Sequence, residues 1–189
     1  MFNRGLILGV LGLAGCAALE PLPAVSPLAQ PQLVSFQIAG RISVRHDAEG
    51  FSGNLTWRHV NGEDEFVILT PLGQGVARII KNAAGVSLEM PDQAIMHAQN
   101  VESLTQSALG FALPLSGLPY WVQAQPVGSE PQLRHNPDGT LDQLREQGWQ
   151  IDYLAYRAEG ALQLPGKVFM ENAEVKLRLI VDAWQVPAP

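Results

Sequence analysis

The sequence predicts an α+β fold that is mainly antiparallel β-sheet, with one or two helices inserted in the middle of the chain. Most apolar segments are short and alternate with polar residues, which is typical of strands with one face in water. Between residues 100 and 124 the apolar spacing changes to that of a helix, and strand patterns then return. The simplest architecture is a strongly curved antiparallel sheet, and we expect the functional region to lie between this sheet and the helices.

The first two strands are predicted by the clearest alternation in the chain. Apolar residues occupy one face from Val34 to Val44, with Gly40 on that face, where the missing side chain allows a bend or a close approach. The alternation resumes from Phe51 to Trp57, and the polar stretch 46–50 predicts the turn of a hairpin.

A meander of short strands is expected next. Residues 66–69 are apolar at every position, which predicts a strand covered on both faces that stops at Pro71. Three more short strands are predicted at 76–81, 85–90 and 93–98. The acidic run at 63–65 is interpreted as a solvated turn rather than a catalytic pair.

A short amphipathic helix is predicted after residue 100. Asn100 is a favourable N-cap, apolar residues recur at helical spacing up to Leu109, and Gly110 ends the run. A second helical candidate at 114–124 is interrupted by Gly117 and Pro119. The remaining strands are predicted at 140–146, 149–156, 167–171 and 175–184.

The N-terminus has the three parts of a secretory signal, namely a basic start, an apolar core and small residues at the cut. The apolar core, residues 5–14, is about half the length that spans a bilayer. It ends in Leu13-Ala14-Gly15-Cys16, which resembles the lipobox of bacterial lipoproteins, where the cysteine is acylated and becomes the first mature residue. The alternative is an ordinary signal peptide that leaves a cysteine near its cut. Cys16 is the only cysteine, and a single thiol in an oxidising compartment is better explained when lipidation uses it.

This segment sets the expected organisation of the chain. We predict a lipoprotein signal peptide at 1–15, removed on maturation; a tether at 16–32 that contains four prolines; and a single domain at 33–187. In enterobacterial lipoproteins an aspartate after the cysteine signals retention in the inner membrane. Ala17 stands there instead, so the resemblance implies a lipid anchor on the periplasmic face of the outer membrane.

Composition excludes several classes of function. The chain has 189 residues and a net charge of −6, which argues against nucleic acid and against adhesion to anionic lipid by charge. Hydrophobic residues make up 47% of the chain and charged residues 16%, below the roughly 25% of ordinary soluble domains. Either an ordinary β-rich core or a larger apolar interior explains this excess.

The sequence offers little sign of catalysis. The four histidines are scattered without zinc-ligand spacing, and neither a nucleophile elbow nor a glycine-rich phosphate loop is present. We therefore expect no metal, no cofactor and no enzymatic activity, although a triad assembled only in space would escape this test.

The segment Thr70-Pro71-Leu72-Gly73 places one large apolar residue in a turn. The turn is predicted to present Leu72 outward, where it could touch lipid. Burying a leucine is worth about 1.5–3 kcal/mol, which biases an encounter with a membrane but cannot anchor a protein. Among the aromatic residues, Trp57 and Trp121 are the candidates for lining a cavity.

Several segments taken in order resemble the LolB family of outer-membrane lipoproteins. Besides the lipobox, the matching pieces are Gly40-Arg41-Ile42-Ser43, Phe51-Ser52-Gly53, Leu55-Thr56-Trp57, Pro71-Leu72-Gly73, Leu109-Gly110, Leu113-Pro114-Leu115, Leu118-Pro119-Tyr120-Trp121, Gly148-Trp149 with Tyr153, and Asp182-Ala183-Trp184.

The resemblance implies an incomplete curved β-barrel whose apolar concave face is covered by helices. It also implies a monomeric receptor that accepts lipoproteins from a LolA-like periplasmic carrier, holds their acyl chains in a hydrophobic cavity and inserts them into the inner leaflet of the outer membrane. Leu72 would be the membrane-insertion residue. The expected cavity-lining residues are Phe36, Ile38, Leu55, Trp57, Leu104 and Trp121. The rival interpretation is a periplasmic lipid-binding or envelope-assembly scaffold that handles another amphiphile.

Overall fold

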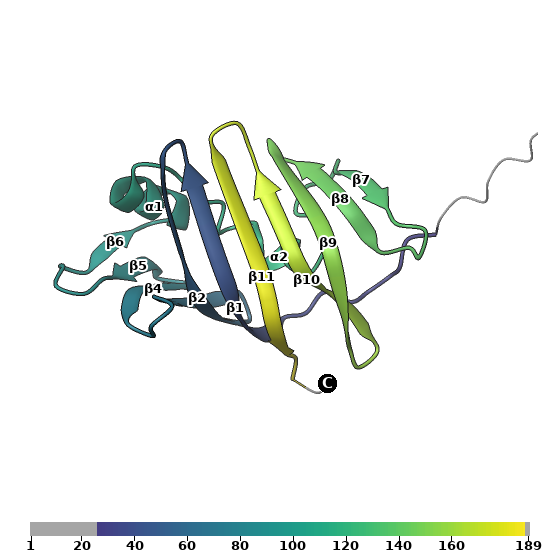
Figure 1. Ribbon diagram of the computed structural model, residues 1–189, viewed down its shortest axis with the longest axis horizontal. Coiled ribbons are helices and arrows are strands. Elements are labelled where there is room, and N and C mark those ends of the chain that lie inside the picture. The colour runs from purple at the N-terminus through teal and green to yellow at the C-terminus, as the bar shows by residue number, and fades with distance from the viewer. Residues whose placement is uncertain (1–25, 188–189) are drawn as a thin grey trace, which may run out of the picture.

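The computed structural model describes residues 26–187, which form one open antiparallel sheet of eleven strands with two helices on its inner face (Figure 1). The strand order is β6-β5-β4-β3-β2-β1-β11-β10-β9-β8-β7, and no pairing among the described residues joins the edge strands β6 and β7. The strands are β1 (Ser35–His46), β2 (Glu49–Val60), β3 (Glu63–Leu69), β4 (Gly75–Asn82), β5 (Gly85–Glu89), β6 (Met96–Ala98), β7 (Gln132–His135), β8 (Leu141–Glu146), β9 (Trp149–Glu159), β10 (Leu162–Glu171) and β11 (Val175–Gln185). The mainly antiparallel α+β class and the incomplete barrel are therefore confirmed.

The predicted hairpin of the first two strands is present as β1 and β2. Their register places Ile38 opposite Trp57, and the buried positions alternate along both strands as the apolar pattern indicates. Gly40 lies where β1 shifts register against β11. A Cβ atom there would lie 2.1 Å from the carbonyl oxygen of Ile180, so the close approach expected of this glycine is confirmed. Val34 differs from the prediction: it precedes the strand and is 64% exposed.

Two strand predictions needed correction. β3 is not covered on both faces, because Phe66 and Ile68 are buried while Val67 and Leu69 on the outer face are only partly so. The acidic run at 63–65 belongs to this strand and is not a solvated turn, since Asp64 is buried on its inner face. β7 and the first half of β10 were not predicted at all.

The helices cover the inner face of the sheet. α1 (Val101–Leu109) is capped as predicted: the Asn100 side chain accepts a hydrogen bond from the Ser103 backbone N–H at 2.8 Å, and Gly110 adopts a φ of 84°. α2 (Leu118–Trp121) is a single turn. Buried residues of both helices belong to the same apolar cluster as the inward residues of the strands. No helix among residues 26–187 is long and apolar enough to cross a membrane.

Residues 28–33, which we call the strap, lie against the domain instead of standing clear of it. The Leu28 N–H donates to the Gly139 carbonyl at 2.9 Å, and the Gln30 side chain exchanges two hydrogen bonds with the Gln163 backbone at 2.8 and 2.7 Å. Contacts with the fold thus begin before residue 33. The division into signal peptide, tether and domain stays a prediction, and Cys16 lies outside the described residues.

Candidate functional site

The six residues expected to line a cavity converge on one interior. Phe36, Ile38, Leu55 and Trp57 point inward from β1 and β2, while Leu104 and Trp121 come from the two helices. All six are at most 2% exposed, and Trp57 is completely buried. The sheet and the helices are therefore in direct apolar contact across the predicted functional region.

This interior is closed in the structure. Each of the six residues is at most 2% exposed, and five pockets on the surface of the described residues are lined by other residues. Because protein interiors are close-packed, long acyl chains can enter this region only if the helices move away from the sheet. The cavity-lining role of the six residues accordingly stays a prediction.

The second helix is held down by a buried carboxylate. The Glu146 side chain on β8 accepts hydrogen bonds from the Trp121 indole N–H and from the Val127 and Gly128 backbone N–H groups, the latter two at 2.8 and 2.7 Å. The Tyr153 hydroxyl on β9 donates to the Trp121 carbonyl at 2.9 Å, and burial raises the pKa of Tyr153 well above its ordinary value. α2 is thus attached to the sheet by directional contacts as well as by packing.

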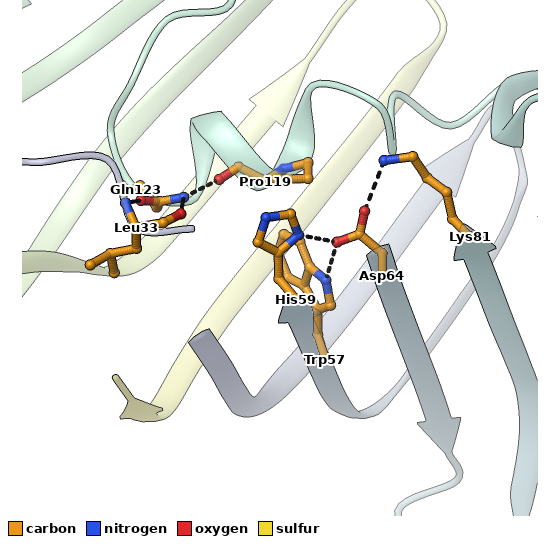
Figure 2. A network of polar contacts seen from close by, with 7 residues as sticks. All are labelled: Leu33, Trp57, His59, Asp64, Lys81, Pro119 and Gln123. Carbon is orange, nitrogen blue, oxygen red and sulfur yellow. Dashed lines mark hydrogen bonds and ion pairs between the residues drawn. The ribbon is translucent and has the colours of Figure 1, made fainter. Parts of the chain in front are cut away.

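Gln123 fastens α2 to the strap (Figure 2). Its side-chain oxygen accepts from the Leu33 N–H at 2.6 Å, and its amide nitrogen donates to the carbonyls of Leu33 and Pro119 at 3.2 and 2.6 Å. The side chain is 3% exposed, so these bonds are shielded from water. Gln123 therefore connects Leu33 of the strap to the short helix α2 by hydrogen bonds.

The first helix is tied to the connection that follows it. The Thr105 hydroxyl accepts from the Leu113 N–H at 2.9 Å, and the Glu102 carboxylate accepts from the backbone and hydroxyl of Ser116 at 3.1 and 3.0 Å. The segment from α1 to α2 is consequently cross-braced within itself.

A second buried carboxylate, Asp64, organises the inner face near Trp57 (Figure 2). Its oxygens accept from the Trp57 indole at 3.0 Å, from the His59 Nδ1 at 2.6 Å and from the Lys81 ammonium at 2.9 Å. The ring of His59 also stacks on Phe36 with centroids 4.9 Å apart. The network therefore fixes two of the predicted interior residues, Trp57 directly and Phe36 through His59.

Burial would by itself raise the pKa of Asp64. The hydrogen bonds from His59, Lys81 and Trp57, together with the positive charge of Lys81, outweigh burial and hold that pKa below its ordinary value. Asp64 is therefore an ionised, satisfied carboxylate inside an apolar interior. Its contacts explain its burial without a catalytic role.

Leu72 stands at the tip of a tightly bonded turn between β3 and β4. The Gly73 N–H donates to the Thr70 carbonyl at 2.9 Å, the Thr70 N–H donates to the Gln74 carbonyl at 2.8 Å, and Gly73 adopts a φ of 85°. This combination of a turn with a left-handed glycine is common in three-residue hairpin loops. Leu72 is 90% exposed, so the structure places it outward as the sequence predicts.

Sequence reasoning missed three polar residues of this region, namely Asp64, Gln123 and Glu146. Asp64 lies within the acidic run 63–65, and Gln123 and Glu146 also have polar neighbours, so neither period nor motif marks any of the three as buried. The described residues contain no group of three or more His, Cys, Asp or Glu side chains arranged to hold a metal ion.

The fold places the chain in a known structural class. A LolA superfamily protein from Nitrosomonas europaea superposes with a TM-score of 0.53 at 13% identity, covering 85% of this chain and 89% of the other. A DUF1329 family protein from Desulfovibrio piger gives a TM-score of 0.52 at 5% identity, covering 82% and 87%. At these identities the likeness shows a shared fold: an open antiparallel sheet of the LolA type.

The particular family follows from sequence relatives. The family model described as outer membrane lipoprotein LolB matches residues 34–184. The outer-membrane lipoprotein LolB of Thiobacillus denitrificans is 38% identical over 92% of this chain and 91% of its own length, and that of Chromobacterium violaceum is 35% identical over 98% and 100%. The chain belongs to the LolB family, and this membership confirms the resemblance and the assignment to the outer membrane.

Proposed function

We propose that this protein is an outer-membrane receptor that takes lipoproteins from a LolA-like periplasmic carrier and inserts them into the inner leaflet of that membrane. Acyl chains would bind between the inner face of the sheet and the two helices. Cys16 would carry the lipid anchor, and Leu72 would make contact with the bilayer. We propose that the receptor works as a monomer and without a catalytic step.

The observation that carries this proposal is the exposure of Leu72. A large apolar side chain, 90% exposed, is held at the tip of a turn braced by three hydrogen bonds. Neither packing nor the turn itself requires leucine at this position, since the backbone bonds and Gly73 define the turn. Contact with lipid supplies a reason for an apolar residue there.

The energetics of cargo support transfer by affinity alone. Burying an acyl chain is worth about 0.8 kcal/mol per CH₂ group, so a lipoprotein with several long chains cannot cross an aqueous compartment exposed. Without an energy source, each acceptor in the route has to bind the chains better than its donor. The interior here is entirely apolar at its six predicted positions, which suits that task once the helices open.

A transfer assay with purified components tests the proposal. A triacylated lipoprotein loaded on its periplasmic carrier is mixed with this protein, and cargo is followed first onto the protein and then into phospholipid vesicles, without nucleotide. We expect both steps to proceed. Failure of uptake, together with a different amphiphile in mass spectra of the purified protein, would favour the lipid-binding scaffold instead.

The variant Leu72→Glu separates uptake from delivery. Because Leu72 lies outside the apolar core, we expect the variant to fold and to accept cargo normally. Delivery to vesicles should fall, since a charged residue replaces the one that enters lipid. Leu154→Glu is the matched control, because Leu154 is 56% exposed on β9 in the other half of the sheet. Equal delivery by the two variants would contradict the assigned role of Leu72.

A further inference from the structure

Exposed apolar side chains gather at one corner of the sheet. Of the eight large hydrophobic residues that are exposed among residues 26–187, three lie there: Leu72 at 90%, Val76 at 38% and Ile95 at 53%. They belong to the β3–β4 turn, the start of β4 and the loop that leads into β6. The other five lie in the strap (Leu28), just before β1 (Val34), between α2 and β7 (Val127), and on β7 and β9 (Leu133 and Leu154).

Strand pairing brings these segments to the same end of the sheet. β4 and β5 are antiparallel, with Arg78 opposite Glu89, so the start of β4 lies beside the end of β5. β5 and β6 are antiparallel as well, with Leu88 opposite Met96, so the loop containing Ile95 leaves from that same end. Neighbouring strands are about 4.8 Å apart, so the Leu72 turn and the Ile95 loop are neighbouring projections.

We propose that the Leu72 turn and the Ile95 loop together form a two-point contact surface for a phospholipid bilayer. The inference rests on the proposed function and extends it, because it adds a second insertion point in a different loop. With two points the domain can tilt only about the line that joins them, whereas a single leucine leaves it free to pivot in every direction.

The surface suits a bilayer better than a protein partner. Its apolar side chains stand on projecting turns rather than around a recess, and a deformable lipid surface can take up separate projections. Arg78 lies close to this corner, but its guanidinium already pairs with Glu65 at 2.8 Å and with Glu89 at 3.3 Å, so it is not free for an acidic partner. Asp92 in the same loop as Ile95 is exposed and acidic. Contact with the membrane would therefore be apolar and would gain nothing from anionic lipid.

The test compares Ile95→Glu with the control Leu154→Glu in the full, membrane-anchored protein. Ile95 and Leu154 are exposed to similar extents, 53% and 56%. Vesicles of phosphatidylcholine receive cargo from each variant, and uptake from the carrier is measured separately. We expect Ile95→Glu to take up cargo normally and to deliver it about tenfold more slowly, as loss of one inserted aliphatic side chain predicts. Delivery equal to that of Leu154→Glu would overturn the inference.

Measuring Leu72→Glu in the same assay distinguishes failure of the second insertion point from failure of the proposed function. Impaired delivery by Leu72→Glu with normal delivery by Ile95→Glu would reject the second insertion point and leave the proposed function intact. Normal delivery by both variants would reject the proposed role of Leu72 as well.

Lipid composition gives an independent readout. Replacing a third of the phosphatidylcholine with phosphatidylglycerol should leave delivery by the wild-type protein unchanged or lower it. A marked increase would show that charge attracts this corner, and would overturn the apolar surface proposed here.

Discussion

The Asp64 network predicts a large loss of stability when its carboxylate is removed. In Asp64→Ala the Trp57 indole, the His59 ring and the Lys81 ammonium lose their common acceptor. The side chain of Lys81 is 30% exposed and can turn toward water. Trp57 and His59 are buried and cannot, so the cost comes mainly from these two groups.

An unsatisfied buried donor costs about 1–3 kcal/mol, so two of them should lower the free energy of unfolding by about 2–6 kcal/mol. Typical domains have only about 5–15 kcal/mol in total, which makes the loss easy to measure. Urea unfolding at pH 7, followed by tryptophan fluorescence, is a suitable assay. Glu63→Ala is the control: it removes an exposed carboxylate next in sequence and should change stability by less than about 0.5 kcal/mol. Equal unfolding midpoints for the two variants would refute the reasoning.

The same carboxylate predicts the direction of a pH effect. The pKa of Asp64 is lower in the folded protein than its ordinary 3.8, so near and below that pH the unfolded chain binds the proton more readily. Its contribution is therefore complete above the unfolded pKa and is lost as the pH falls through the folded pKa. The wild-type protein should lose stability between about pH 5 and pH 3 more steeply than Asp64→Asn, which has no carboxylate to titrate. Parallel pH profiles would show that Asp64 does not contribute in this way.

Two further variants test the attachment of α2 to the strap and the centre of the sheet. Gln123→Ala removes two hydrogen bonds to Leu33 of the strap and one to Pro119 of α2. Amide exchange of α2 should therefore accelerate about tenfold or more while β1 stays protected. Unchanged exchange in α2 would show that Gln123 does not fasten it. Gly40→Ala places a Cβ atom 2.1 Å from the Ile180 carbonyl oxygen, so it should lower the free energy of unfolding by several kcal/mol or prevent folding. Gly75→Ala is the control, because a Cβ atom there has no atom within 4 Å to meet. The control should fold normally by circular dichroism. Wild-type stability in Gly40→Ala would mean that β1 and β11 can separate locally at little cost.

The sequence predicted those strands and helices whose own residues carry the apolar spacing or the capping signal. The alternation from Phe36 to Val44 and the capped run from Asn100 to Gly110 each carry their own signal, because one face of the strand and one stripe of the helix are buried. β7 carries no such signal: it is polar and mostly exposed at a sheet edge, and only its partner β8 makes it a strand. β10 contains Pro165 at a register shift, which breaks the pattern of its first half.

The functional region was predictable in its apolar part and not in its polar part. Trp57 and Trp121 could be placed inside because large aromatic residues on an apolar face are usually buried. The partners of those tryptophans could not. Asp64 lies in an acidic run that resembles a solvated turn, and one of its three partners, Lys81, is seventeen residues away. Glu146 meets Trp121 across 25 residues, so only the folded sheet brings the two together.

The seam between β1 and β11 has a consequence for how the protein folds. It joins residues about 140 apart, as the pair Arg41 and Asp182 shows. Closing a loop of this length costs about 4 kcal/mol of chain entropy. The meanders β1–β6 and β7–β11 can therefore form before β1 pairs with β11. A chain still being exported N-terminus first therefore lacks a complete sheet, and the open side of β1 is exposed to other strands. That side of β1 becomes paired only when residue 175 and those after it are available to form β11.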